Sequence, residues 1–113
     1  MKTDDFNKQV SKRLGLITSI LLKKGDEYAS TIDRLHSFKE GCNLSFHNIP
    51  EKFGWELNCK HLQSIKDMLN KIELGQLPSE DLVEEKFGDA INYLILLEAM
   101  IKERINYKYG TKP

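Results

Sequence analysis

The 113-residue sequence lacks an excess of charge of either sign. Seventeen lysine and arginine residues balance seventeen aspartate and glutamate residues. Proteins that bind DNA or RNA through its phosphates usually carry a basic excess or a basic stripe. The balance therefore argues against a nucleic acid polymer as the main partner, although it leaves room for local patches of charge.

Long hydrophobic runs are also missing. The N-terminal residues MKTDDFNKQV contain no apolar segment of the kind that directs export. The most apolar window, INYLILLEAMI at residues 91–101, is too short to span a bilayer and contains a glutamate. We therefore expect neither export nor a membrane partner.

Cysteine is scarce, since Cys42 and Cys59 are the only two. No second pair accompanies them, so their spacing does not form a zinc site. Nothing else in the sequence suggests secretion, where a disulfide would persist. We expect two free thiols in a cytoplasmic protein.

Hydrophobic residues recur at helical spacing along most of the chain, and no strand-like alternation competes with them. The pattern predicts helices at roughly residues 4–24, 30–41, 50–73 and 79–106. Neither an internal repeat nor a low-complexity linker divides the sequence. The expected fold is a single all-α domain over residues 1–113, a four-helix bundle.

The predicted helix ends carry recognisable residues. Ser30 or Thr31 suits the N-cap of the second helix, and Ser79 suits that of the last. Pro50 suits the first position of the third helix. Gly41 is expected to end the second helix.

Apolar stripes identify the faces that we expect to point into the core. In the first helix the stripe is Phe6, Val10, Leu14, Ile17 and Leu21. In the second helix it is Ile32, Leu35 and Phe38. In the third helix it is Trp55, Leu62, Ile65, Leu69 and Ile72, with Asn58 as its one polar exception.

The last helix carries acids on the same stripe as its apolar residues. Along the stripe lie Glu85, Asp89, Asn92, Tyr93, Leu96 and Met100. Buried carboxylates need a cation, a donor or water. Two carboxylates four residues apart project from adjacent turns, so Glu85 and Asp89 can share a divalent cation. The alternative is a solvated flank of an amphipathic helix.

The third helix places His61 on an apolar face, with Ile65 and Met68. A histidine there is either a hydrogen-bonded core residue or a ligand. Lys60 and Asp67 belong to a polar stripe and are also explained by a surface ion pair.

The first helix is followed by a charged break, LLKKGDEYASTIDRLHSF at residues 21–38. Lys24 and Arg34 suit phosphate oxygens. The carboxylate of Glu27 suits Mg²⁺, which bridges to substrate phosphates. The ring of Tyr28 can stack on a base. The alternative is a solvated loop with a few ion pairs.

Three segments together resemble a known group of proteins. They are LKKGDEYA, KHLQSIKDML and EEKFGDAINYLILLEAMI, within roughly residues 14–105. They resemble small bacteriophage and prophage proteins of the MazG-like, nucleotide-modification-associated group, which belong with the all-α nucleotide pyrophosphohydrolases. The resemblance implies a cytoplasmic protein of an infected bacterial cell, a dimer or higher oligomer, and a nucleoside triphosphate bound through Mg²⁺.

The resemblance also implies site residues. From the first segment they are Lys24, Asp26, Glu27 and Tyr28, from the second Lys60, His61 and Asp67, and from the third Glu85, Asp89 and Asn92. The sequence departs from the usual MazG pattern of E-x-x-E on one helix and E-x-x-D on the next. His61 and Asp67 stand where two glutamates are expected, and Glu85 to Asp89 is one residue longer than E-x-x-D.

Two functions of different classes follow from these residues. The first is a Mg²⁺-dependent nucleotide pyrophosphohydrolase, with Glu27, Glu85 and Asp89 as metal ligands. In it Lys24 and Lys60 contact phosphates, and a carboxylate or His61 orients the attacking water.

The second is a sponge that sequesters a nucleotide, including a cyclic or ADP-ribose-type immune signal of the host, without turnover. The incomplete set of carboxylates favours it. A helical interaction module without any nucleotide ligand is the third option.

Overall fold

The computed structural model describes the backbone of residues 1–24 and 33–108 and the side chains of residues 1–23 and 33–106. Within these ranges the chain forms helices and no strands. The elements are α1 (Thr3–Thr18), the π-helical turn η1 (Ser19–Lys24), α3 (His36–Leu44), α4 (Pro50–Glu73) and α5 (Glu80–Lys108). None of the helices in these ranges has the length and apolar character required to cross a membrane.

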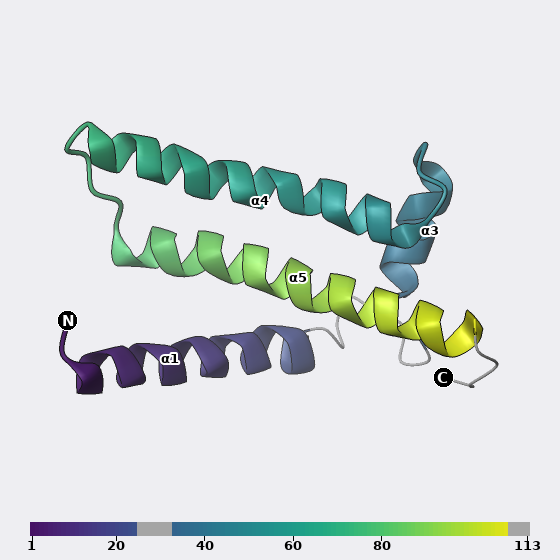
Figure 1. The fold of residues 1–113 in the computed structure, drawn as a ribbon, viewed down its shortest axis with the longest axis horizontal. Coiled ribbons are helices and arrows are strands. Elements are labelled where there is room, and N and C mark those ends of the chain that lie inside the picture. Colours follow the sequence, from purple (N-terminus) through teal and green to yellow (C-terminus); the bar gives the residue numbers. More distant parts are fainter. Residues whose placement is uncertain (25–32, 109–113) are drawn as a thin grey trace.

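The long helices form a layer in which α5 lies between α4 and α1, and α3 crosses one end of that layer (Figure 1). Helices α4 and α5 run antiparallel across a short turn. Gly75 ends α4 with a φ of 83°, a backbone conformation that glycine adopts without strain. Ser79 caps α5, since its hydroxyl accepts a hydrogen bond from the Leu82 amide at 3.2 Å, as the sequence predicts.

The helix limits correct the prediction at two places. The first helix continues to residue 24, but its last six residues are π-helical. The second helix begins at His36 and ends at Leu44, rather than covering 30–41. The proposed caps Ser30 and Thr31 lie outside the described residues. Instead, the Asp33 carboxylate accepts a hydrogen bond from the Leu35 amide at 3.0 Å, just before α3.

The core lies where α3 meets α4 and α5. Leu35, Phe38 and Met100 are buried there, as predicted. Phe53, Leu57, Tyr93, Leu96 and Leu97 pack against them. The rings of Phe38 and Tyr93 meet edge to face, with centroids 6.0 Å apart. Both cysteines are free thiols, as predicted, with Cys42 buried and Cys59 exposed.

Several residues that the sequence placed inward are exposed instead. On α1 these are Phe6, Val10 and Leu14. On α4 they are Trp55, Leu62, Leu69 and Ile72. The reason is the flat arrangement. Arg13 and Leu16 of α1 and Ile20 of η1 face α5, whereas Phe6, Val10 and Leu14 remain exposed among the described residues.

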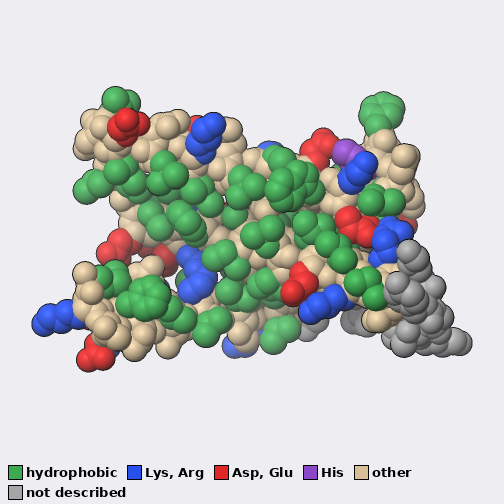
Figure 2. Space-filling view, viewed as in Figure 1, with side chains coloured by type: hydrophobic (Ala, Val, Ile, Leu, Met, Phe, Trp, Pro, Cys, Tyr) green, Lys and Arg blue, Asp and Glu red, His purple; other side chains and the backbone are tan. Residues whose placement is uncertain are grey.

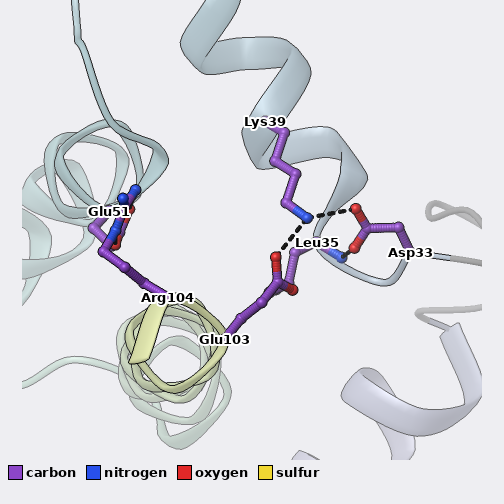
Figure 3. Close-up of polar contacts among 6 residues, drawn as sticks. All are labelled: Asp33, Leu35, Lys39, Glu51, Glu103 and Arg104. Atoms are coloured by element: carbon purple, nitrogen blue, oxygen red, sulfur yellow. Dashed lines mark hydrogen bonds and ion pairs between the residues drawn. The ribbon is translucent and has the colours of Figure 1, made fainter. Parts of the chain in front are cut away.

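Ion pairs join α3 to α5 and α4 to α5 (Figure 3). Lys39 of α3 lies between Asp33, at 2.7 Å, and Glu103 of α5, at 2.6 Å. Arg104 of α5 binds both carboxylate oxygens of Glu51, near the start of α4. The Arg104 guanidinium lowers the pKa of Glu51, and the hydrogen bond from Lys39 lowers the pKa of Asp33. The carboxylates are therefore stabilised in their charged form.

These lowered pKa values predict a loss of stability in acid. A carboxylate whose folded pKa lies below its unfolded pKa stabilises the fold fully only above the unfolded value, and the contribution disappears as pH falls through the folded value. For Glu51 the ordinary pKa is 4.5.

We expect Glu51→Gln to lower the free energy of unfolding at pH 7 by up to about 1 kcal/mol and to change it little at pH 3. The effect is small because the Arg104 side chain is half exposed, so water screens the ion pair. Urea melts at both pH values measure this. Glu73→Gln, at the exposed end of α4, is the control, and an equal loss at pH 3 and pH 7 would contradict the assignment.

A further prediction concerns the contact of α3 with α4. A side chain at Gly41 would overlap the ring of Phe53. We expect Gly41→Ala to destabilise the fold by about 1–3 kcal/mol. The control is Gly15→Ala in α1, where the new methyl group meets nothing within 4 Å. There the better helix propensity of alanine should stabilise the fold by about 0.5–1 kcal/mol. Thermal melts of the two variants should shift in opposite directions, and a shared direction would contradict this packing.

Candidate functional site

A small cavity of about 100 Å³ lies between α1 and α5. It contains the acidic part of the predicted stripe. Its lining residues are Arg13, Leu16, Ile17, Ile20, Glu84, Glu85, Gly88, Asp89 and Asn92. Glu85, Asp89 and Asn92 are thus brought together against α1, at the edge of the interior.

Arg13 of α1 brings a cation to this cavity. Its guanidinium donates a hydrogen bond to the backbone carbonyl of Glu84 at 3.2 Å. Gly88 makes room for it, because a Cβ at that position would lie 2.8 Å from Arg13 Nη1. A guanidinium has five N–H donors. Arg13 therefore has further N–H groups that can donate hydrogen bonds to an anionic ligand beside the carboxylates.

Asn92 is the buried polar member of the cavity. The residue is 7% exposed, and its Oδ1 atom has no hydrogen-bond partner among the residues that the structure describes. A buried amide oxygen without a partner costs about 1–3 kcal/mol. We expect this oxygen to accept a hydrogen bond or to coordinate a cation when a ligand is bound.

A second buried asparagine lies on the other side of α5. Asn58 of α4 is 2% exposed, and its Nδ2 donates to the carbonyl of Ala90 at 3.4 Å. Its Oδ1 also lacks a partner. Asn58 does not line the cavity between α1 and α5. Asn58, the polar exception on the apolar stripe of α4, is therefore buried, as expected, and its hydrogen bond links α4 to α5.

His61 of α4 meets Asp89 from the side opposite α1. The Nδ1 atom of His61 lies 3.7 Å from Asp89 Oδ2. The imidazole also rests on the Tyr93 ring, with centroids 5.0 Å apart and planes at 36°. Asp89 therefore lies between the cavity and His61, at a distance from the imidazole that is longer than a direct hydrogen bond.

A wider cavity of about 590 Å³ follows the small one along α5. Leu21 comes directly after Ile20, and Ile95 lies about one turn after Asn92, so the two cavities are neighbours. The wide cavity is lined by Leu21, Leu22, Asp33, Arg34, Leu35, Ile95, Leu96, Ala99, Lys102, Glu103 and Asn106. Its volume lies in the range of small-molecule sites. Arg34, a predicted phosphate ligand, thus faces an apolar hollow next to the carboxylates.

Other predicted residues lie elsewhere. Asp67 accepts a hydrogen bond from Gln63 at 2.9 Å and lines a separate cavity near the turn between α4 and α5. Lys60 is exposed on α4. The backbone of Lys24 is described as the last residue of η1, whereas its side chain and the proposed residues Asp26, Glu27 and Tyr28 lie outside the described part of the chain.

The residue that sequence reasoning missed is Arg13. It shares a helix face with Leu16, Ile17 and Ile20, so it is a charged residue on an otherwise apolar flank. A charged residue on an apolar flank was the available sign of a buried partner. The sequence alone could not identify that partner, Glu84, which lies 71 residues further along the chain.

Three acidic residues, Glu84, Glu85 and Asp89, and the amide of Asn92 line the small cavity. The Glu84 carboxylate forms an ion pair with Lys12, so Glu85, Asp89 and Asn92 are the potential metal ligands. Across residues 1–24 and 33–108, no three His, Cys, Asp or Glu side chains are grouped so that they could hold a metal ion. Oxygen ligands suit Mg²⁺, which keeps several waters and takes further oxygens from substrate phosphates. The unpartnered Oδ1 of Asn92 beside Glu85 and Asp89 fits this donor set.

Comparison of the chain with protein-family models, with curated proteins and with solved structures gives no match.

Proposed function

We propose that the groove between α1 and α5 binds a nucleotide with Mg²⁺, and that the protein is a nucleoside triphosphate pyrophosphohydrolase. The observation that supports this most is Asn92, whose buried Oδ1 has no partner in the cavity that Glu85 and Asp89 line. The all-helical fold agrees with the MazG-like resemblance. The phage origin and the cytoplasmic setting are part of the same proposal.

In this proposal the parts of the groove have different roles. Glu85, Asp89 and the amide oxygen of Asn92 hold the Mg²⁺ ion, which neutralises charge on the phosphate oxygens when bound. Arg13, which lines the small cavity, and Arg34, which lines the wide one, contact phosphates. Glu27, Lys24, Tyr28 and Lys60 keep the roles that the resemblance implies.

His61 takes the part of the base. Asp89 and the Tyr93 ring lie beside its imidazole, which accepts a proton from the attacking water in this proposal. Asp67 lies in a different cavity, so the proposal gives it no contact with the reacting atoms.

Sequestration without turnover is the second candidate. It is favoured by the small number of carboxylates in the groove and by Arg34 and Lys102, which line the wide, largely apolar cavity. Such a cavity suits the base and sugar of a cyclic nucleotide or an ADP-ribose-type signal, while the cations hold its phosphates.

Thermal melts with and without chelator distinguish the two candidates. A ligand at 100 times its Kd stabilises the folded state by about 2.7 kcal/mol. We expect a nucleoside triphosphate with Mg²⁺ to raise the melting temperature by several degrees, and EDTA to remove the shift. A shift that survives EDTA would favour the sponge. No shift with any nucleotide would contradict both candidates and leave the interaction module.

A further inference from the structure

A cavity of about 630 Å³ lies where α3 crosses the end of the layer, bounded also by the start of α4 and the end of α5. The proposed function does not use this cavity. Its volume lies in the range of small-molecule sites. Figure 2 shows both acidic and basic side chains at the surface of this end of the molecule. The cavity is therefore a second candidate binding site.

The floor of this cavity is apolar and continuous with the core. Leu35 and Met100 line it and are each 5% exposed, and Pro50 at the start of α4 completes it. The methyl group of Met100 packs on α4, because a Cβ at Gly54 would lie 2.8 Å from it. An apolar group of a ligand would be removed from water against these three side chains, called here the apolar floor.

Two ion pairs line the cavity above the apolar floor, one toward α3 and one toward α4 (Figure 3). Glu103 is directed at Lys39 of α3, whereas its neighbour Arg104 is directed at Glu51 of α4. The Glu51 side chain is 11% exposed, so this charge is largely withdrawn from water. The lining thus carries two positive and two negative charges, which cancel.

The ion pairs leave hydrogen-bonding capacity of both kinds. Lys39 has three N–H groups, and its partners Asp33 and Glu103 engage two of them. Within the described ranges, the Nη1 atom of Arg104 and the Oε2 atom of Glu103 have no hydrogen bond or ion pair. The cavity can therefore donate hydrogen bonds to a carboxylate and accept them from an ammonium group at the same time.

The balance of charge indicates the class of ligand. A polyanion such as a nucleotide would bring an excess of negative charge beside two partly buried carboxylates, and a simple cation would bring the opposite excess beside Lys39 and Arg104. Uncompensated charge in such a place is costly. We propose that this cavity binds a zwitterion with an apolar side chain, a free amino acid of the phenylalanine or leucine type. Its carboxylate lies on Lys39 and Arg104, its ammonium group on Glu103 and its side chain on the apolar floor.

This inference does not rest on the proposed function. The wide cavity along α5 shares Leu35 and Glu103 with this one, but neither Met100 nor Arg104 lines it. The Met100 methyl group therefore reports on the cavity at α3 rather than on the nucleotide groove.

The test uses the methionines as reporters in a spectrum of carbon-labelled methyl groups. Met68 is the internal control, since it lines the separate cavity near the turn between α4 and α5. Phenylalanine should shift the Met100 signal and leave the Met68 signal in place, and Met100→Leu identifies the Met100 signal by removing it. Phenethylamine lacks the carboxylate and hydrocinnamate lacks the ammonium group. Each should bind about tenfold more weakly than phenylalanine, or weaker still, because one charged hydrogen-bonding group is lost.

Glu103→Gln tests the contact with the ammonium group. The variant leaves an excess of positive charge in the cavity, so hydrocinnamate should now bind more tightly than phenylalanine. Glu98→Gln removes an exposed carboxylate of the same helix that does not line the cavity, and it should keep the original order. An unchanged Met68 signal in both variants shows that the fold is kept. The ligand series on the unchanged chain tests the same proposal without any variant.

Three results would overturn the proposal. One is a Met100 signal that stays in place with leucine, methionine, phenylalanine and tryptophan up to millimolar concentration. Another is equal binding of phenylalanine and its two singly charged analogues, which would leave the ion pairs without a role in recognition. The third is an unchanged order of affinity in Glu103→Gln.

Discussion

Asp89→Asn is expected to lower nucleotide turnover by about 100-fold or more while leaving the thermal melt nearly unchanged. Asp89 lines the small cavity between α1 and α5, and its Oδ2 lies 3.7 Å from Nδ1 of His61. The asparagine keeps the shape of the side chain but removes its charge. Loss of charge weakens the hold on Mg²⁺ and on the imidazole together. Release of pyrophosphate, measured under Mg²⁺ saturation, is the readout.

The matched control is Glu98→Gln on the same helix. Glu98 is an exposed carboxylate in an ion pair with Lys102 at 3.6 Å, and it does not line the small cavity between α1 and α5. Its loss should leave turnover unchanged. Full activity in Asp89→Asn would remove Asp89 from the site, while an equal loss in both variants would point to an effect of net charge alone.

Asn92→Leu is expected to stabilise the protein and to abolish binding of the nucleotide with Mg²⁺. The buried Oδ1 of Asn92 has no partner in the described part of the chain, so an apolar side chain of similar size removes an unsatisfied group. A gain of about 1 kcal/mol corresponds to a rise of roughly 4–8 °C in Tm for a domain of this size. The same change removes an oxygen from the cavity that Glu85 and Asp89 line. Stability and binding should therefore move in opposite directions.

Asn58→Leu is the control that separates the loss of nucleotide binding from the gain in stability that follows removal of a buried, unsatisfied amide. Asn58 also has an unpartnered Oδ1, but it lies between α4 and α5, outside the cavity. We expect its leucine variant to keep nucleotide affinity within about twofold of the unchanged chain. Calorimetric titration of both variants measures this. If Asn92→Leu kept its affinity, the amide would have no role in ligand binding.

Much of the helical architecture could be predicted from sequence, because helix ends and apolar periodicity are local. Pro50 begins α4 and Ser79 caps α5, as expected. The direction of the apolar faces was predicted less well. A stripe identifies which side of a helix is apolar, but not whether the same chain covers it. Leu62 and Leu14 therefore proved exposed.

The candidate site could be predicted where its residues share one helix. Glu85, Asp89 and Asn92 lie on adjacent turns of α5, so their spacing alone places them together. Arg13 could not be found this way, since its position beside Gly88 depends on how α1 packs on α5. Asp67 shows the opposite case, because it follows His61 closely in sequence but lines a different cavity.

We propose that the groove between α1 and α5 binds a nucleotide and cleaves it. The most direct test is incubation of the protein and Mg²⁺ with a panel of nucleoside triphosphates, deoxynucleotides, cyclic dinucleotides and cyclic ADP-ribose isomers. Mass spectrometry then quantifies the filtrate and the material released from heat-denatured protein. We expect a new nucleoside monophosphate with loss of its parent triphosphate, and Asp89→Asn should prevent this conversion. A compound recovered intact only from the denatured protein would contradict hydrolysis and establish a sponge, and an unchanged panel in both fractions would contradict nucleotide binding itself.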